Sequence, residues 1–286
     1  MTVRHCAVHT MTLKPLSLAE TCAALAARGV PAVTVWRQHL PGGDAREAAR
    51  IVRDHGLIVP ALCRGGFFPA VDAAGRQAAI DDNRRALDEA AALGASQVVL
   101  VCGAVPGMPL AQARRQIADG IAACVPHAAA LGVRLAIEPL HPCYAGARSA
   151  ISTIAQAAAI CREFSLTAPA HPAAPGAAAC KLVGIAVDVY HVWWDEAVEA
   201  GIAEAGRQGW LHAFHVCDWK AEPQDLLNDR GVMGEGVIDL PHLVRCAAQA
   251  GFAGFSEIEI FSTRRWAGDQ RAFLDDCLGA WDRTCA

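Results

Sequence analysis

Short runs of apolar residues alternate along the chain with longer segments in which apolar residues recur every three or four positions. The short runs have the near-continuous hydrophobicity of parallel strands that are buried on both faces. The longer segments have the periodicity of amphipathic helices. Eight strand–helix units follow, with strands in RHCAVHT, AVTVWR, LIVPALCR, SQVVLVCG, VRLAIE, LVGIAVD, LHAFHVCD and FSEIEIF and helices at about 17–28, 44–55, 73–93, 110–131, 149–164, 193–205, 240–250 and 270–282.

Eight successive strand–helix units predict a closed (β/α)₈ TIM barrel. A glycine follows five of the predicted helices, as helix C-termini favour, at Gly29, Gly56, Gly94, Gly132 and Gly251. An open doubly wound sheet is the alternative, but no G-x-G-x-x-G follows the first strand. We therefore expect one α/β domain over residues 1–286, interrupted by a Pro/Ala-rich surface loop at 166–180 that contains His171.

Composition narrows the class of protein. Apolar residues make up 53% of the chain, enough for a large core, and the net charge of −4 gives no reason to expect a nucleic-acid partner. The chain has no apolar run of membrane-spanning length and no signal-peptide pattern at its start, so we expect a cytoplasmic protein without a membrane partner. The 12 cysteines form no C-x-x-C pair, so we expect them to be reduced and mostly buried.

Four consecutive predicted strands end in side chains that can bind a metal ion: Glu138, Asp188, His215 and Glu259. Their spacings of 50, 27 and 44 residues keep them in register with the strand–helix units, each of which takes about 30 residues. In TIM barrels the carboxyl ends of the strands meet at the face that carries the active site. These four side chains are therefore expected to meet at one rim of the barrel.

Strand alternation selects among neighbouring candidates. His212 and His215 are three residues apart, so in a regular strand they face opposite sides, and His215 is nearer the rim. Glu257 and Glu259 share a face, and Glu259 is the nearer of the two to the rim. We expect Glu257 to lie one layer lower, or to form a salt bridge inside the barrel.

The chemistry of the four side chains favours one divalent cation. Three carboxylates crowded together would repel strongly, and a divalent ion removes that cost. A mostly oxygen set with one imidazole suits Mn²⁺, Mg²⁺ or Co²⁺ better than structural zinc, and we expect Mn²⁺ first, with Mg²⁺, Co²⁺ or Zn²⁺ as the alternatives. For each residue alone, a paired structural charge is the competing interpretation.

Five stretches, AIEPLHP, VDVYHVWWD, AFHVCDW, DRGVMGEGVIDLPHL and EIEIFS, resemble the xylose isomerase-like TIM-barrel family of sugar phosphate isomerases and epimerases, which includes ketose 3-epimerases. The resemblance implies that the family's metal ligands match Glu138, Asp188, His215 and Glu259. It also implies that Glu138 and Glu259 are the acid/base pair and that His191 binds substrate.

The chain departs from the epimerase pattern at one position. The epimerases carry an arginine shortly after the ligand histidine, where this chain has Ala221 with Lys220 beside it. Arg230 is expected to supply the missing positive charge. This departure bears on the C3-epimerase specificity that the resemblance implies, and not on the implied fold or metal site.

Other rim residues have a functional and a structural interpretation. His141 and Tyr144 follow Glu138 and are candidates for substrate contact, with loop packing as the alternative. Arg37 follows the second strand and could bind a substrate carboxylate or phosphate, as could Arg64, or form a salt bridge. His9 ends the first strand and is a further pocket candidate. Trp193 and Trp194 are expected in core packing rather than in sugar stacking.

The predicted function is a divalent-metal-dependent sugar isomerase or epimerase that abstracts a proton next to a carbonyl and forms a metal-stabilised enediolate. The expected partner is a small carbohydrate, and self-association into a homo-oligomer is open. A lyase or dehydratase acting on a keto sugar or keto-inositol would use the same site and differ in its leaving group. A phosphodiesterase of the endonuclease IV type would need three metals, and a non-catalytic barrel would need none.

Overall fold

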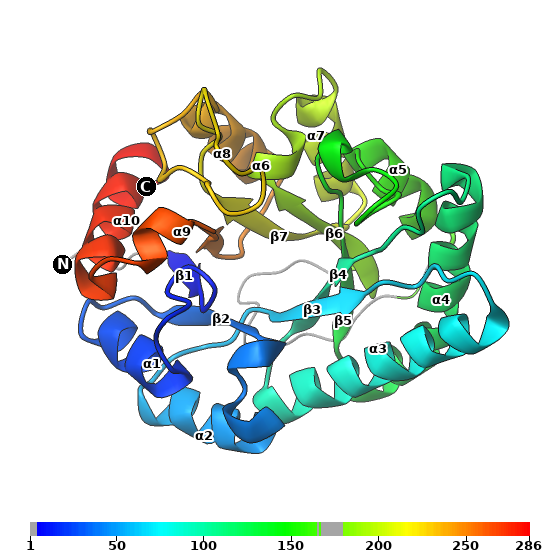
Figure 1. The fold of residues 1–286 in the computed structure, drawn as a ribbon, viewed down its shortest axis with the longest axis horizontal. Coiled ribbons are helices and arrows are strands. Elements are labelled where there is room, and N and C mark those ends of the chain that lie inside the picture. Colours follow the sequence, from blue (N-terminus) through cyan, green and yellow to red (C-terminus); the bar gives the residue numbers. More distant parts are fainter. Residues whose placement is uncertain (1–4, 165, 167–179) are drawn as a thin grey trace.

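The computed structural model describes residues 5–164, 166 and 180–286 of the chain. Within them, eight parallel strands close into a barrel in the order β1-β2-β3-β4-β5-β6-β7-β8. The helices surround this barrel, and the chain ends directly after α10 (Figure 1). The predicted (β/α)₈ TIM barrel is confirmed. Nearly all of the predicted surface loop at 166–180, including His171, lies outside the described residues.

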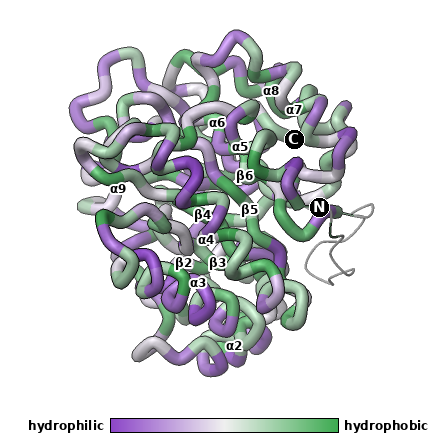
Figure 2. The backbone as a smooth tube through the Cα atoms, turned by 90° about the vertical axis from the view of Figure 1, so that its right-hand side faces the viewer, coloured by the Kyte–Doolittle hydropathy of each residue, from purple (hydrophilic) through white to green (hydrophobic). Residues whose placement is uncertain are grey.

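The strands are short and buried, as their apolar runs predict. Their bounds are β1 Cys6–His9, β2 Ala32–Trp36, β3 Leu62–Gly66, β4 Gln97–Val101, β5 Arg134–Glu138, β6 Val183–Asp188, β7 Leu211–Val216 and β8 Ser256–Ile258. In Figure 2 the tube is largely hydrophobic at β5 and β6, as expected for strands that are covered on both faces.

The longer helices are α1 Leu18–Ala26, α2 Ala45–Asp54, α3 Ala73–Leu93, α4 Leu110–Leu131, α5 Ile154–Cys161, α7 Val198–Arg207, α8 Leu240–Gln249 and α10 Gln270–Thr284. Local chemistry sets their ends. Ser17 and Glu20 form a capping box at the start of α1. Gly94 and Gly132 end α3 and α4 with φ of 79° and 68°, in the left-handed region that favours glycine. No described helix is long and apolar enough to cross a membrane.

Two of the helix predictions are wrong at their boundaries. The helix expected at 149–164 spans only Ile154–Cys161, because Thr153 caps its start and the Ser149 hydroxyl accepts a hydrogen bond from the backbone of Ile151. The helix expected at 193–205 is replaced by α6 (Val189–Val192), which Asp188 caps, and by α7. Short 3₁₀ turns at Arg37–His39 (η1), Pro41–Gly43 (η2) and Pro142–Tyr144 (η3), and helix α9 at Thr263–Trp266, complete the described elements.

A β-bulge in β7 corrects the alternation argument for its two histidines. Ile185 pairs with Leu211, but the next residue of β6, Ala186, pairs with Ala213, so His212 is an extra residue in β7. A Cβ on Gly184 would lie 2.4 Å from His212 Nε2. Gly184, Ala186 and Asp188 alternate on one face of β6, so His212 faces the barrel interior as His215 does. The expectation that the two histidines face opposite sides is wrong, because the bulge resets the alternation between them, while His215 is the one of the two at the rim.

Candidate metal and substrate site

Four predicted ligands meet at the carboxyl ends of the strands. Glu138 is the last residue of β5, Asp188 the last of β6, His215 the next-to-last of β7, and Glu259 follows β8 directly. All four are buried, and one ligand atom of each lies within 4.8 Å of the corresponding atoms of the others. The strand-end positions therefore converge in space as their spacing predicts.

Small side chains occupy the layer beneath these four. Ala136, Ala186 and Ala213 each precede a ligand by two residues on the same strand, and all three are fully buried in the cluster of residues inside the barrel. Because strand side chains alternate, these alanines lie directly below Glu138, Asp188 and His215. Below Glu259 the corresponding residue is Glu257, as expected.

Several polar atoms of this group have no hydrogen-bond partner, although they are buried. His215 Nδ1 lies 3.2 Å from Glu138 Oε1 and 3.7 Å from Glu259 Oε2. Within the described part of the chain, neither ring nitrogen of His215 nor Glu138 Oε1 makes a hydrogen bond. Buried polar atoms normally have partners. Oxygen and imidazole donors that converge without partners are suited to hold a divalent cation.

Arg230 lies against the same carboxylates. Its Nη1 donates to Asp188 Oδ2 and Glu259 Oε2, both at 2.9 Å, and to the Glu259 carbonyl oxygen at 3.2 Å. The guanidinium also lies between the rings of Tyr190 and Phe261, at 4.4 and 4.9 Å from their centroids. The structure thus places the charge of Arg230 against two of the four predicted ligands.

The protonation of the group follows from its charges. Burial raises the pKa of Asp188 to about 7, although Arg230 acts in the opposite direction. Burial would also raise the pKa of Glu259, but His9, Arg230 and His215 hold it well below its usual value. Burial would lower the pKa of His215, yet Glu138 and Glu259 hold it well above its usual value. The carboxylates therefore attract positive charge into this part of the barrel.

The loop between β7 and α8 carries Arg230 and is held by Asp218. The buried Asp218 carboxylate accepts backbone hydrogen bonds from Trp219, Gly234, Gly236 and Ile238. A Cβ on Gly236 would lie 2.1 Å from a backbone carbonyl oxygen. Glycine is therefore required at that point for the loop to fold over the barrel.

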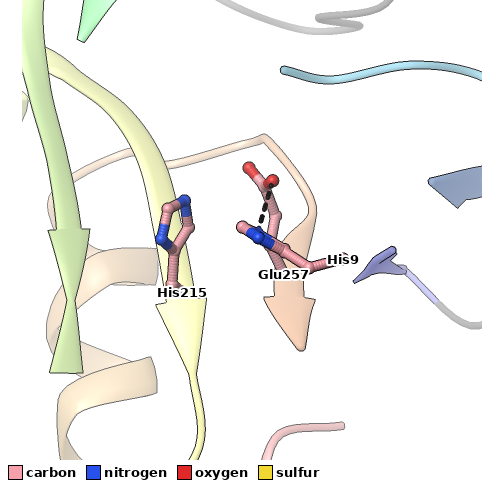
Figure 3. A group of neighbouring side chains, drawn as sticks. All are labelled: His9, His215 and Glu257. Carbon is pink, nitrogen blue, oxygen red and sulfur yellow. Dashed lines mark ion pairs between the residues drawn. The ribbon is translucent and has the colours of Figure 1, made fainter. Parts of the chain in front are cut away.

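A second group of ionisable side chains adjoins the first. His9 Nε2 lies 3.4 Å from Glu257 Oε2, and His9 Nδ1 lies 3.1 Å from Glu259 Oε1. Figure 3 shows His9 from β1, Glu257 from β8 and His215 from β7 side by side, with the His9–Glu257 ion pair as a dashed line. Thr34 donates a hydrogen bond to Glu257. Glu257 thus forms the salt bridge inside the barrel that the sequence predicts.

His9, His215 and Glu257 form a second set of ligand-type atoms within 4.8 Å of one another. This set shares His215 with the first. The Trp36 indole donates to His9 Nδ1 at 3.0 Å and fixes the ring. His9, which sequence reasoning left as a pocket candidate, is therefore part of the site.

Two of the predicted substrate contacts border the ligand group. His191 Nε2 lies 3.5 Å from Asp188 Oδ2 and 3.3 Å from Arg230 Nη2. Burial, and then the charge of Arg230, hold the pKa of His191 well below its usual value, so the ring is neutral. The Tyr144 ring packs edge-on against His191 at 5.7 Å. The Tyr144 hydroxyl donates to the Leu226 carbonyl, so it holds the loop after β7.

His141 is half-buried and lies among aromatic rings. Its ring stacks on Trp219 at 4.7 Å and meets Trp194 edge-on at 5.8 Å. Its Nδ1 accepts a hydrogen bond from the backbone of Cys143. The Trp193 ring also packs against Trp219, at 5.7 Å. These rings form an aromatic wall beside the loop after β7.

Two predicted substrate contacts are engaged elsewhere. Arg37 donates two hydrogen bonds to Asp82 and two to Glu89, both on α3, so its guanidinium forms the salt bridge that was the alternative. Lys220 forms an ion pair with Asp229 in its own loop. The structure does not bring either cation into the ligand group. Their partners lie far along the chain or within a loop, where the sequence pattern gives no indication of contact.

The main residue that sequence reasoning missed is Asp218. The sequence pattern marks it only as the end of a strand, although an aspartate followed by a glycine-rich loop can anchor the loop's backbone N–H groups. Most of the described cysteines are buried, as the sequence predicts.

Comparisons with known proteins agree with this fold. A family profile described as Xylose isomerase-like TIM barrel matches residues 22–277. No curated protein sequence matches the chain. Among solved structures, protein SMc04130 from Sinorhizobium meliloti 1021 is 44% identical and covers 99% of both chains, with a TM-score of 0.90.

Two more distant structures share the fold. The IolI protein with a binding zinc atom is 17% identical over 98% of both chains, with a TM-score of 0.81. D-psicose 3-epimerase in the presence of D-fructose is 16% identical over 98% of both chains, with a TM-score of 0.72.

Proposed function

Because the chain belongs to the xylose isomerase-like TIM-barrel family, we propose that it is a divalent-metal-dependent sugar isomerase or epimerase. The proposed reaction moves a proton on a carbon next to a carbonyl. One observation carries the proposal: Glu138, Asp188, His215 and Glu259 converge from four strand ends, and Glu138 Oε1 and both ring nitrogens of His215 are buried there without hydrogen-bond partners among the described residues. A zinc-binding protein and a sugar epimerase are among the similar structures, which supports both parts of the proposal.

We assign Glu138, Asp188, His215 and Glu259 as the residues that hold the metal. Mn²⁺ is our first choice for this mostly oxygen set, with Mg²⁺, Co²⁺ or Zn²⁺ as alternatives. The bound cation would supply Lewis-acid polarisation of a substrate carbonyl and its neighbouring hydroxyl.

Glu138 and Glu259 are assigned to the proton transfers. They end β5 and follow β8, two strands that are not neighbours in the barrel, so they approach the site from different sides. One carboxylate would take the proton from carbon and the other would return it. Delivery to the opposite face of the same carbon gives epimerisation, and delivery to the neighbouring carbon gives isomerisation.

Substrate oxygens are assigned to His191 and Arg230. The neutral His191 ring can donate or accept a hydrogen bond, and Arg230 can donate from a position that its two aromatic neighbours fix. We retain His141 as a substrate contact, because its wall with Trp194 and Trp219 offers aromatic faces to a sugar ring. Tyr144 is assigned to positioning His191.

The test combines metal analysis with solvent exchange. Purified protein is expected to hold one divalent ion per chain at the barrel group. NMR in D₂O is expected to show deuterium entering the carbon next to the carbonyl when the protein meets its ketose or keto acid. Bound metal without exchange on any carbonyl compound in a broad screen would refute proton transfer.

A lyase or dehydratase acting on a keto sugar or keto-inositol is the alternative that shares this site. Mass spectrometry separates the two, because elimination changes the substrate mass and epimerisation does not. A phosphodiesterase of the endonuclease IV type would bind more than one metal ion at the barrel rim, and the group of His9, His215 and Glu257 makes the number of ions bound at the rim the measurement that decides.

A further inference from the structure

Glu199, His242 and Cys246 form another group of metal-type donors, outside the barrel. Glu199 lies in the first turn of α7, and His242 and Cys246 are four residues apart on α8, so they share a helix face. One ligand atom of each lies within 4.8 Å of the others. The group is carried by helices that cover the barrel, whereas the ligands at the rim are carried by strand ends.

The two neighbours of His242 approach the same ring nitrogen. Nε2 lies 2.8 Å from Glu199 Oε1 and 3.6 Å from Cys246 Sγ. A nucleophile–base–carboxylate relay would need the thiol and the carboxylate on opposite nitrogens of the ring. Burial, and then the charge of Glu199, raise the pKa of the Cys246 thiol, whereas a nucleophilic cysteine has a lowered pKa. Three donors that point to one place have the geometry of a shared ion.

We propose that Glu199, His242 and Cys246 bind one Zn²⁺ ion that links α7 to α8, with the fourth position open to water. A carboxylate and a thiolate neutralise the dication, and the imidazole completes a borderline-soft donor set. Binding releases the Cys246 thiol proton to solvent. Tetrahedral zinc separates N from S by about 3.6 Å and N from O by about 3.4 Å. The S···N separation already fits, and the Glu199 side chain, 62% exposed, is free to move outward.

A surface groove gives the ion access to these donors. Glu199 and Cys246 both line a surface groove of about 430 Å³ between α7 and α8. Small residues, Ala200 and Ala203, form part of its wall. No loop has to open for a hydrated ion to reach the donors.

Cobalt substitution isolates this site from the one at the barrel rim. A thiolate bound to Co²⁺ gives a near-ultraviolet charge-transfer band, and none of the four rim ligands is a cysteine. We expect the intact protein to develop this band when it is titrated with Co²⁺ to two equivalents, enough for the rim site and this one, and Cys246→Ser to lose the band. Cys143→Ser removes an exposed cysteine far from the group and is expected to keep the band. No band in protein that has bound two equivalents of Co²⁺, or a band that survives Cys246→Ser, overturns the proposal.

Alkylation of the unmodified protein gives a second readout. We expect Zn²⁺ to slow iodoacetamide labelling of Cys246 at least tenfold, and labelling of Cys143 to continue at its original rate. Equal labelling of Cys246 with and without Zn²⁺ contradicts the site. Because His242→Ala removes the central donor, we expect it to abolish the protection.

A separate observation concerns Arg64 in β3, whose positive charge has no carboxylate partner among the described residues. Cys63 pairs with Val99 and Gly65 with Leu100, so Arg64 is the extra residue of a bulge in β3. Bulges near active sites re-aim side chains. The Arg64 guanidinium lies 4.3 Å from the centroid of the Phe67 ring, and Phe67 has φ of 53°, which is uncommon for a residue other than glycine.

Arg64 and its neighbour Arg148 have no carboxylate partner among the described residues. The rest of the chain, residues 1–4, 165 and 167–179, contains no Asp or Glu that could provide one. Burial, and then the charge of Arg148, lower the pKa of Arg64, while Glu138 acts in the opposite direction. A half-buried guanidinium that is repelled by a second one is costly without a partner anion.

We infer, on the basis of the proposed function, that the substrate carries an anionic group that Arg64 and Arg148 bind. A sugar phosphate and a sugar acid both meet this requirement, because guanidinium binds phosphate and carboxylate alike. The anion would lie at the side of Glu138 while the carbonyl end of the substrate faces the four rim ligands.

The test uses inorganic phosphate and malonate as probes, titrated into EDTA-treated protein so that neither can bind through a metal. We expect binding of at least one probe and a weakening of tenfold or more in Arg64→Gln and in Arg148→Gln. Arg53→Gln, which removes an exposed charge at the end of α2, is the matched control and is expected to bind as the unmodified protein does.

The ratio of phosphate to malonate affinity distinguishes a sugar phosphate from a sugar acid as the class of substrate. Equal binding in Arg64→Gln and the unmodified protein, or no binding of either probe, overturns the inference. These titrations need no turnover, so their failure is distinct from failure of the proposed function, which the exchange experiment tests.

Discussion

The interior of the barrel has polar side chains at both ends, and the two ends differ in the sign of their charge. At the carboxyl ends of the strands, three ligand carboxylates surround His215, and Arg230 lies against two of them. At the amino ends lie Arg134, Gln97 and His212, without a carboxylate among them. All of these residues are buried.

Both ends contain buried polar atoms without hydrogen-bond partners among the described residues, including both ring nitrogens of His212 and of His215, so the ends differ in the charge of the groups around them. Arg134 donates to the Ser96 hydroxyl, which donates to the Pro60 carbonyl, and Gln97 donates to the His212 carbonyl. Burial, and then Arg134, hold the pKa of His212 well below its usual value, so that ring stays neutral. A buried histidine beside carboxylates attracts a cation, and one beside an arginine does not. The surroundings of each histidine, rather than its burial, therefore indicate which end carries the chemistry.

The largest expected effect is on rate, at the carboxylate end. Glu259→Gln removes one proton-transfer group, and general acid–base catalysis contributes about 10²- to 10⁴-fold to rate. We expect solvent deuterium exchange into substrate to slow by that factor, as measured by NMR. Arg134→Met, at the other end, should leave exchange within about threefold of the unmodified rate, since it lies far below the site. Equal losses in both variants would remove the distinction between the two ends.

The second effect is on metal content and compares the two histidines of β7. His215→Gln is expected to lose about one equivalent of divalent metal, because the ion loses a ligand. His212→Gln is expected to keep its metal, since its side chain lies among groups that cannot bind a cation. Elemental analysis after dialysis checks both. Retention of metal by His215→Gln would show that the ion binds elsewhere.

The third effect is on stability without metal. Arg230→Met removes the guanidinium from two buried carboxylates, and breaking such a pair costs about 3–5 kcal/mol. We expect the free energy of unfolding in EDTA to fall by that amount, measured by urea denaturation. Added Mn²⁺ should recover a large part of it, because a cation compensates the same carboxylates. If Arg230→Met lowered the free energy of unfolding by the same amount with and without Mn²⁺, the guanidinium and the metal ion would not act on the same carboxylates.

The smallest effect sharpens the description of the amino-terminal end. A Cβ at Gly184 would lie 2.4 Å from both His212 Nε2 and the Trp210 carbonyl oxygen. Gly184→Ala is therefore expected to cost about 1–3 kcal/mol of stability through overpacking. Metal content should be unchanged. A Gly184→Ala protein that is as stable as the unmodified protein would show that His212 does not lie against β6.

The convergence of four side chains at the rim could be predicted because each ends an apolar run, and eight such runs leave little choice of fold. Asp188 stands out as the one charge in β6, and Glu138 as a charge that follows three apolar residues in β5. The bulges at Arg64 and His212 could not be predicted, because an extra residue in a strand leaves no mark in a pattern of apolar side chains. The partners of Arg37 lie on a helix that the same pattern predicts, but the contact depends on how that helix packs. The anchoring role of Asp218 depends on a loop fold that only the structure gives.

The layer of Ala136, Ala186 and Ala213 has a consequence for how the rim can change over evolutionary time. Alanine has no side-chain rotamers, so this layer loses no side-chain conformational entropy on folding and cannot change rotamer when a neighbour is substituted. The positions of Glu138, Asp188 and His215 are therefore set by the backbone beneath them. New preferences for a ligand are then expected to arise in the surrounding loops, while the positions of these three rim residues are kept.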